Sequence, residues 1–167
     1  ILKKYFLMEQ EWQDLHYQDN MAHVRKAIRE HVVTTITSLS TTGSNVYETR
    51  YFPLQTGNLP ALIVYTLDET VEDYTIGQNT RTQFRSLNLI IEAHCRGTAN
   101  IDDTLDTIAE EVEEAMVTDI SRGGHAKDTK LVSTDIEFDT ASQKTGLMRL
   151  TYLISYNTVE NAVQTGV

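Results

Sequence analysis

The sequence predicts an α+β fold with two layers, in which a mostly antiparallel or mixed β-sheet carries two helices on one face. Two segments repeat apolar residues at helical spacing, and several shorter segments alternate or run apolar. The order of these segments is α-β-β-β-α-β-β. The chain has 167 residues and is 40% hydrophobic, which suits one domain with its own core. We therefore expect a single two-layer domain.

The first helix is predicted between residues 21 and 39. Asp19 or Asn20 can cap its start, and the small residues of "STTGSN" follow its end. Apolar residues three or four positions apart form one stripe: Val24, Ala27, Ile28, Val32, Ile36 and Leu39. One face of this helix is therefore expected to be buried.

The second helix is predicted between residues 100 and 119. Asn100 can cap it, and Asp102 and Asp103 lie in the first turn, where the helix dipole favours negative charge. Its apolar stripe consists of Ile101, Leu105, Ile108, Ala109, Val112, Ala115 and Met116. This is the stronger of the two helix predictions.

Five segments have the patterns of strands. They are 46–52, 61–68, 82–97, 130–141 and 146–158. The third is long and alternates imperfectly, so we expect a bulge near Ser86. The sequence "SQKTG", residues 142–146, predicts a hairpin turn between the last two strands.

The domain is expected to span residues 21–160, with an N-terminal extension or arm over 1–20 and a C-terminal tail over 161–167. The longest apolar runs have strand length, which predicts no membrane span, and the first residues lack a signal-peptide core. The single cysteine, Cys95, excludes an internal disulfide and fits a reducing compartment. The protein is therefore expected to fold in a cytoplasm.

No catalytic, metal or cofactor site is predicted. His94 and Cys95 are adjacent in a strand, so their side chains point to opposite faces and cannot form a nucleophile–base pair with each other. His23 and His31 are about two helical turns apart, too far for a helical zinc pair. The segment "SRGGHAKDTK" lacks the glycine spacing of a phosphate loop, so it is a flexible connection or a contact loop.

Acidic residues outnumber basic ones by 24 to 14, which disfavours tight nucleic-acid binding. A buried-looking strand continues into an acidic hairpin that contains Asp68, Glu69, Glu72 and Asp73. A second acidic group recurs every four residues along the second helix: Asp102, Asp106, Glu110 and Glu114. Either group forms a solvated face, or it meets a basic partner or lines a channel.

Two stretches resemble a known family. "NLPALIVYTLDETVEDYTIGQNTRTQFRSLNLIIEAHCRG" resembles the middle of tail terminator proteins of lambda-like long-tailed phages, the minor tail protein U family. "GLMRLTYLISYNT" resembles their last strand, and "MAHVRKAIREHVV" their opening helix. The similarity covers residues 21–158. The first twenty residues and the longer loop "TDISRGGHAKDTK" depart from the family pattern.

The resemblance implies a hexameric ring that caps the tail tube, stops its polymerisation and presents a surface to the head–tail connector or head-completion protein. The resemblance also implies that the ring is assembled in the host cytoplasm, resides in the virion neck and lets DNA pass without specific binding. The acidic helix residues named above are candidates for lining the hole. Candidate interface residues are Asp68, Glu69, Glu72, Asp73, Tyr74, Arg122, His125 and Lys127.

Three alternatives remain open at this point. The first is another neck protein, such as a tail-completion or head–tail connector protein. The second is a small cytoplasmic enzyme that uses Cys95 with a distant histidine. The third is a monomeric protein-binding module.

Overall fold

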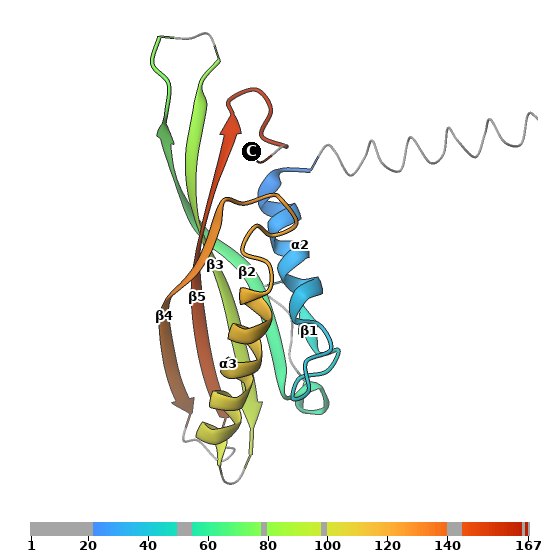
Figure 1. The fold of residues 1–167 in the computed structure, drawn as a ribbon. Coiled ribbons are helices and arrows are strands. Elements are labelled where there is room, and N and C mark those ends of the chain that lie inside the picture. Colours follow the sequence, from blue (N-terminus) through green and yellow to red (C-terminus); the bar gives the residue numbers. More distant parts are fainter. Residues whose placement is uncertain are drawn as a thin grey trace, which may run out of the picture.

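The described part of the chain folds into a five-stranded sheet with two helices on one face (Figure 1). The computed structural model describes residues 22–49, 55–77, 80–97, 100–139, 145–164 and 166. The strand order is β1-β2-β3-β5-β4, and the order of helices and strands along the chain is the predicted one. The arm predicted over residues 1–20 lies outside the described residues.

All neighbouring strands are antiparallel except β1 and β2, which are parallel, so the sheet is mixed. The strands are β1 (Val46–Tyr47), β2 (Ala61–Asp73), β3 (Thr82–Arg96), β4 (Asp128–Asp139) and β5 (Thr145–Val159). The strand predicted over 46–52 is confirmed only for its first two residues, and 50–52 lie outside the described residues. Most of the turn predicted over 142–146 also lies outside them.

α2 comprises Val24–Ile36 and is shorter than the predicted helix. The His23 side chain caps it by accepting a backbone hydrogen bond at 3.2 Å, whereas the predicted caps, Asp19 and Asn20, lie outside the described residues. The helix ends two residues before Ser38, whose φ of 71° is incompatible with a continuing helix. Its buried residues, Val24, Ile28, Val32 and Ile36, have the predicted spacing.

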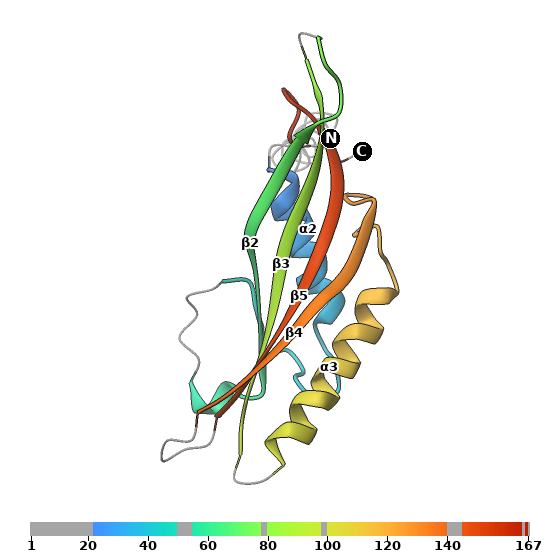
Figure 2. The same cartoon turned by 90° about the vertical axis from the view of Figure 1, so that its left-hand side faces the viewer.

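α3 comprises Ile101–Val117 and lies on the same face of the sheet as α2 (Figure 2). Asn100 occupies the N-cap position as predicted, although its side chain makes no capping hydrogen bond. The helix packs over β3 and β5, whereas α2 packs over β2. Gly146 of β5 lies so close beneath α3 that a methyl group there would overlap side chains of the helix. The buried stripe of α3 is Leu105, Ile108, Ala109, Val112 and Met116.

The bulge expected near Ser86 lies on the neighbouring strand instead. Ser86 pairs regularly with its partners on both sides, and the register shifts between Thr66 and Glu69 of β2. The imperfect alternation of β3 has another cause, because this central strand is buried on both faces. Leu89 belongs to the main core under the helices, whereas Ile90 packs in a small cluster with Ile63 and Tyr65 on the outer face.

The two ends of the described domain lie together. The backbone N–H of Val24 donates a hydrogen bond to the carbonyl of Val163 at 3.1 Å. The start of α2 and the segment after β5 therefore meet at the end of the sheet from which the β2–β3 hairpin projects (Figure 1). Neither helix in the described part of the chain has the length and apolar character required to cross a membrane.

Candidate protein-interaction site

The hairpin formed by the ends of β2 and β3 projects beyond the rest of the sheet (Figure 1). Its apolar side chains are unusually accessible: Val71 is 44% exposed, Tyr74 79% and Ile76 95%. A projecting tip that exposes several large apolar side chains is typical of a surface that contacts another protein. The hairpin is therefore the first candidate interaction surface.

Three of the four hairpin acids lie at the surface. Asp73 forms an ion pair with Arg81 at 2.6 Å, and the Asn88 amide donates to the Asp68 carboxylate at 3.2 Å. Glu72 is exposed. These contacts between neighbouring strands hold the two sides of the hairpin together while leaving most of its negative charge in solvent.

Glu69 differs from the other hairpin acids because its side chain is turned into the protein. The bulge in β2 shifts the side-chain alternation so that Glu69 faces the helix side, where its side chain is only 7% exposed. Arg85 donates to its carboxylate at 2.8 Å, Tyr156 donates its hydroxyl to it, and Arg25 of α2 lies 3.5 Å away. Burial, followed by this contact with Glu69, raises the pKa of Tyr156. The assignment of Glu69 to a contact surface is therefore not supported by its position.

Arg122 is also buried, contrary to its predicted place on a contact loop. Its side chain is fully inaccessible and donates from Nε to the hydroxyl of Thr129 at 3.1 Å and from a terminal nitrogen to the carbonyl of Met116. Burial lowers its pKa. The guanidinium thus fastens the end of α3 to the start of β4. His125 is half-buried and Lys127 is exposed, so these two residues stay candidates for contact.

The loop between α3 and β4 is held by Asp119. Its carboxylate accepts hydrogen bonds from the hydroxyl and backbone N–H of Ser121 and from the backbone N–H of Gly123. The Ser121 hydroxyl contributes most to lowering the pKa of Asp119 to about 2. His31 of α2 approaches the same carboxylate at 3.3 Å. The segment is therefore a hydrogen-bonded turn docked on α2.

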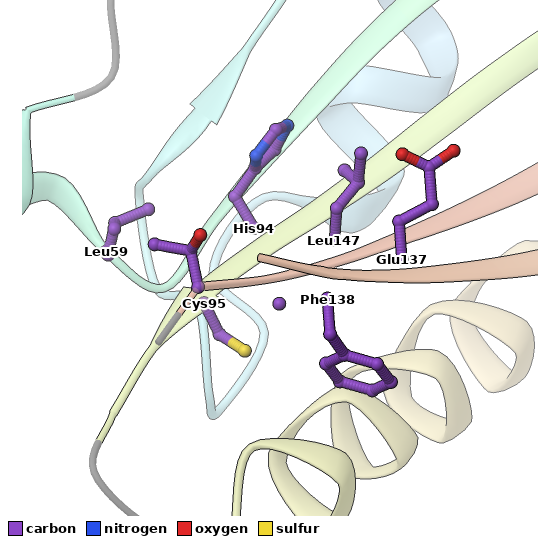
Figure 3. Close-up of a pocket in the computed structure, with 8 residues that line it drawn as sticks. Leu59, His94, Cys95, Glu137, Phe138 and Leu147 are labelled. Atoms are coloured by element: carbon purple, nitrogen blue, oxygen red, sulfur yellow. The ribbon is translucent and has the colours of Figure 1, made fainter. Parts of the chain in front are cut away.

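His94 and Cys95 point to opposite faces of β3, as predicted (Figure 3). Cys95 is buried under α3, where burial raises the pKa of its thiol. His94 lies on the outer face with its Nε2 3.4 Å from Glu92. Both residues line a pocket of about 400 Å³ at the end of the sheet. The two side chains do not form a nucleophile–base pair with each other.

Residues 23–156 match the family described as phage minor tail protein U. The chain belongs to the phage minor tail protein U family. No curated protein sequence matches the chain. The family assignment confirms the resemblance found in the sequence, and it makes the chain a structural protein of the phage tail. The matched range contains α2 and α3 and all of the described sheet except the last residues of β5.

In this tail protein the acidic residues of α3 lie on the helix surface. All four residues named as candidates for lining the hole are exposed: Asp102, Asp106, Glu110 and Glu114. Glu111 is turned differently and accepts hydrogen bonds from the backbone and hydroxyl of Thr41, which ties α3 to the loop after α2. The acidic face of α3 is therefore exposed to solvent in a single copy, and it can contact other molecules in an assembly.

β4 forms an edge of the sheet in this tail protein and is only partly covered. Its apolar residues Val132, Ile136 and Phe138 are 47–49% exposed. The helix layer reaches β3 and β5, so α3 leaves β4 largely uncovered. The strand was predictable from the sequence but this surface was not, because a pattern of apolar residues does not show which strand lies at an edge.

The predicted interface residues do not gather in one place. Tyr74 lies on the β2–β3 hairpin, whereas His125 and Lys127 immediately precede β4 at the other side of the sheet. β3 and β5 separate β2 from β4. This family member therefore presents two distinct candidate surfaces.

Proposed function

We propose that this family member forms a ring that caps the tail tube, terminates tube polymerisation and provides the docking surface for the head connector. The family match over residues 23–156 is the observation that carries the proposal. The role is structural and requires no catalysis or cofactor. The partners are further copies of the chain, the tail tube protein and the head–tail connector or head-completion protein.

A ring requires each copy to present one surface that fits a different surface on the next copy. The projecting hairpin and the β4 edge supply two different surfaces on one domain. The resemblance to tail terminators makes six copies the expected number. The ring assembles in the host cytoplasm before it becomes part of the virion neck.

The hole of the ring must let DNA pass without retaining it. Acidic side chains repel phosphates, and the exposed acids of α3 provide a continuous face of that charge. We place this face toward the hole. The net charge of −10 agrees with a protein that does not hold nucleic acid.

The position and effect of the chain on tail tubes test this function. Tails made in cells that cannot assemble heads should carry the protein at one end, detected by immunogold electron microscopy. Removing the protein should give tubes of uncontrolled length, and supplying the wild-type chain should restore a uniform length. Label found only on heads, together with normal tail length in its absence, would identify a head-side neck protein and overturn the proposal.

A further inference from the structure

The face of the sheet that carries α2 and α3 has room for a third helix. Neighbouring strands lie about 4.8 Å apart, whereas packed helices lie about 8–10 Å apart, so one helix covers about two strands. α2 packs over β2, α3 packs over β3 and β5, and β4 follows β5 as the last strand of the sheet. A helix placed beside α3 would therefore lie over β4.

Two apolar side chains of β4 point toward this position. Ile136 pairs with Met148, which belongs to the core under the helices, and Phe138 pairs with Gly146, which lies directly beneath α3. Directly opposed residues of an antiparallel pair share a face, so both side chains lie on the helix side. Figure 3 shows Phe138 on the side of α3 and Glu137 on the opposite side. We call Ile136 and Phe138, which are 47% and 49% exposed, the β4 helix-side surface.

The side of α3 that overlooks β4 is acidic. Glu111 accepts hydrogen bonds from Thr41 in the loop after α2, so it marks the side of α3 that faces α2. Asp102 lies nine residues before Glu111, which is about two and a half helical turns, and therefore points to the opposite side. Asp106 and Glu113 lie about one and three turns beyond Asp102 and share its side. We call Asp102, Asp106 and Glu113 the acidic side of α3.

The acidic side of α3 has no basic partner within the part of the chain that the structure describes. Its three residues are exposed, and none of them forms an ion pair with a described residue. Asp102 and Asp106 are four residues apart, a spacing at which like charges destabilise a helix. Lysine or arginine side chains beside α3 would relieve this repulsion. An apolar floor next to an acidic side therefore fits a helix that is both apolar and basic.

The other described helix of the chain does not have these properties. The apolar stripe of α2 is already buried against the sheet. Its bases Arg25, Lys26 and Arg29 each pair with a glutamate of the same chain. A second copy would therefore offer no free apolar and basic helix from this element. The observations favour a helix from a different protein.

An added strand would suit the β4 helix-side surface less well than a helix. A strand that pairs with the edge of β4 extends the sheet sideways and leaves Ile136 and Phe138 exposed above it. A helix laid on the face of β4 covers both side chains, as α2 and α3 cover the rest of the sheet. About 15 residues would match the length of α3, since each residue adds about 1.5 Å.

We propose that the β4 helix-side surface and the acidic side of α3 bind an amphipathic helix of another virion protein. Its apolar stripe packs on Ile136 and Phe138, and its lysines or arginines lie toward α3. The inference rests on the proposed function only in placing the partner in the virion. The backbone edge and outer face of β4 stay free for contacts in the ring, and Glu110 and Glu114, which lie farther from β4, stay available to the hole.

Photo-crosslinking in assembled virions identifies the occupant of the β4 helix-side surface. The photoreactive analogue p-benzoylphenylalanine replaces Phe138, and the same analogue at Glu137 on the outer face is the control. Irradiation should join position 138, and not position 137, to another virion protein. Mass spectrometry should place the joined peptide in a segment with apolar residues three or four positions apart and with lysines or arginines beside them.

A synthetic peptide of the joined segment then tests the two parts of the surface separately. Its binding to the full chain is measured by fluorescence anisotropy, and Ile136→Asp should weaken it by about tenfold or more because apolar burial is lost. Asp102→Lys/Glu113→Lys should weaken it by about tenfold or more and reduce its dependence on salt. Asp103→Lys/Glu114→Lys is the matched control, since it makes the same charge change in the same turns but not on the acidic side. This control should change the affinity by less than about threefold, because screening limits exposed charges to short range.

Circular dichroism establishes that each variant is folded. If the variant with lysines on the acidic side unfolds, Asp102→Asn/Glu113→Gln replaces it and is compared with Asp103→Asn/Glu114→Gln. The first amide variant should bind the peptide more weakly than the second.

Each outcome supports or overturns the partner helix. No product at position 138, or equal products at positions 137 and 138, overturns the proposal. Products that join two copies of the chain would make the surface a contact within the ring and overturn a foreign helix. A joined segment without bases, or equal binding by the two lysine variants, overturns the role of the acidic side.

The test separates this proposal from the proposed ring. The whole surface lies on one copy, so a chain that never forms rings should still bind the peptide. Binding without any effect on tail length would refute the ring that caps the tube and leave the partner helix intact. Normal termination of tails by a chain that gives no product at position 138 would do the reverse.

Discussion

At the scale of single residues, Glu92 is the carboxylate that several polar side chains contact on the outer face of the sheet. Tyr65 donates its hydroxyl to this carboxylate at 2.7 Å, Arg149 donates Nε at 3.0 Å, and His94 lies 3.4 Å away. The contact with His94, followed by those with Tyr65 and Arg149, outweighs burial and lowers the pKa of Glu92 to about 2. The ionised form is therefore preferred in the folded state.

The lowered pKa of Glu92 predicts a loss of stability in acid. A carboxyl whose pKa is lower when folded stabilises the protein above its ordinary pKa of 4.5 and ceases to do so as the pH falls toward 2. The Glu92→Gln variant lacks this contribution. The difference in unfolding free energy between wild type and variant, measured in urea, should shrink by about 2 kcal/mol from pH 7 to pH 3. A constant difference would contradict the prediction.

Arg122 shows what the sequence could not predict about single residues. A base beside two glycines in a polar segment indicates an exposed loop. Its burial depends on the Met116 carbonyl at the end of α3 and the Thr129 hydroxyl in β4, which accept hydrogen bonds from its guanidinium. The position of β4 relative to α3 is set by the whole sheet. The residues around position 122 therefore do not predict that Arg122 is buried.

At the scale of elements, the bulge in β2 fixes the β2–β3 hairpin to the body of the domain. It brings Glu69 under the start of α2, where Arg25, Arg85 and Tyr156 surround the carboxylate. Without the extra residue, the alternation of β2 would place Glu69 on the outer face. The direction of the hairpin therefore depends on one buried carboxylate.

Replacing Glu69 with Gln should loosen the hairpin. The substitution leaves Arg85 without its carboxylate, and we expect the unfolding free energy to fall by about 2–4 kcal/mol. Hydrogen exchange of the backbone amides of residues 69–73 and 82–87 should accelerate most. The exposed Glu72→Gln serves as the matched control and should change neither measurement appreciably. Equal behaviour of the two variants would show that Glu69 does not anchor the hairpin.

The elements themselves were largely predictable. The apolar stripes of α2 and α3 and the alternation of β5 depend on neighbours a few residues away, so the sequence contains them. The site of the bulge was not predictable from β3 alone, because Ile90 is buried on the outer face by Ile63 and Tyr65 from a different strand. The exposure of the apolar residues of β4 was not predictable for a similar reason, because it depends on how far the helix layer extends across the sheet.

At the scale of the whole molecule, negative charge dominates and one helix carries a large share of its exposed part. Six acids of α3 are exposed on the helix surface away from the core stripe: Asp102, Asp103, Asp106, Glu110, Glu113 and Glu114. The family places the chain in the phage tail, whereas the position of α3 relative to the path of the DNA is our proposal. The acidic face of α3 was predictable from the sequence, but its orientation in a ring was not.

Reversing this charge should impede the passage of DNA. Rings assembled from Asp106→Lys/Glu110→Lys/Glu114→Lys should retain double-stranded DNA at low salt and release it as salt is added, because lysines attract phosphates. Virions that contain them should eject DNA more slowly in a fluorescence assay. The corresponding glutamine variant is the control for lost acids without added bases. Unchanged ejection by the lysine variant would place α3 away from the hole.

The backbone hydrogen bond between Val24 and Val163 brings both ends of the described domain to the end of the sheet from which the β2–β3 hairpin projects. In a single ring of identical copies with cyclic symmetry, every such pair of ends lies at the same height along the ring axis. A marker protein fused before α2 or after β5 would consequently decorate one rim and leave the opposite rim bare. Such a fusion would distinguish the two sides of the assembly without altering a surface residue.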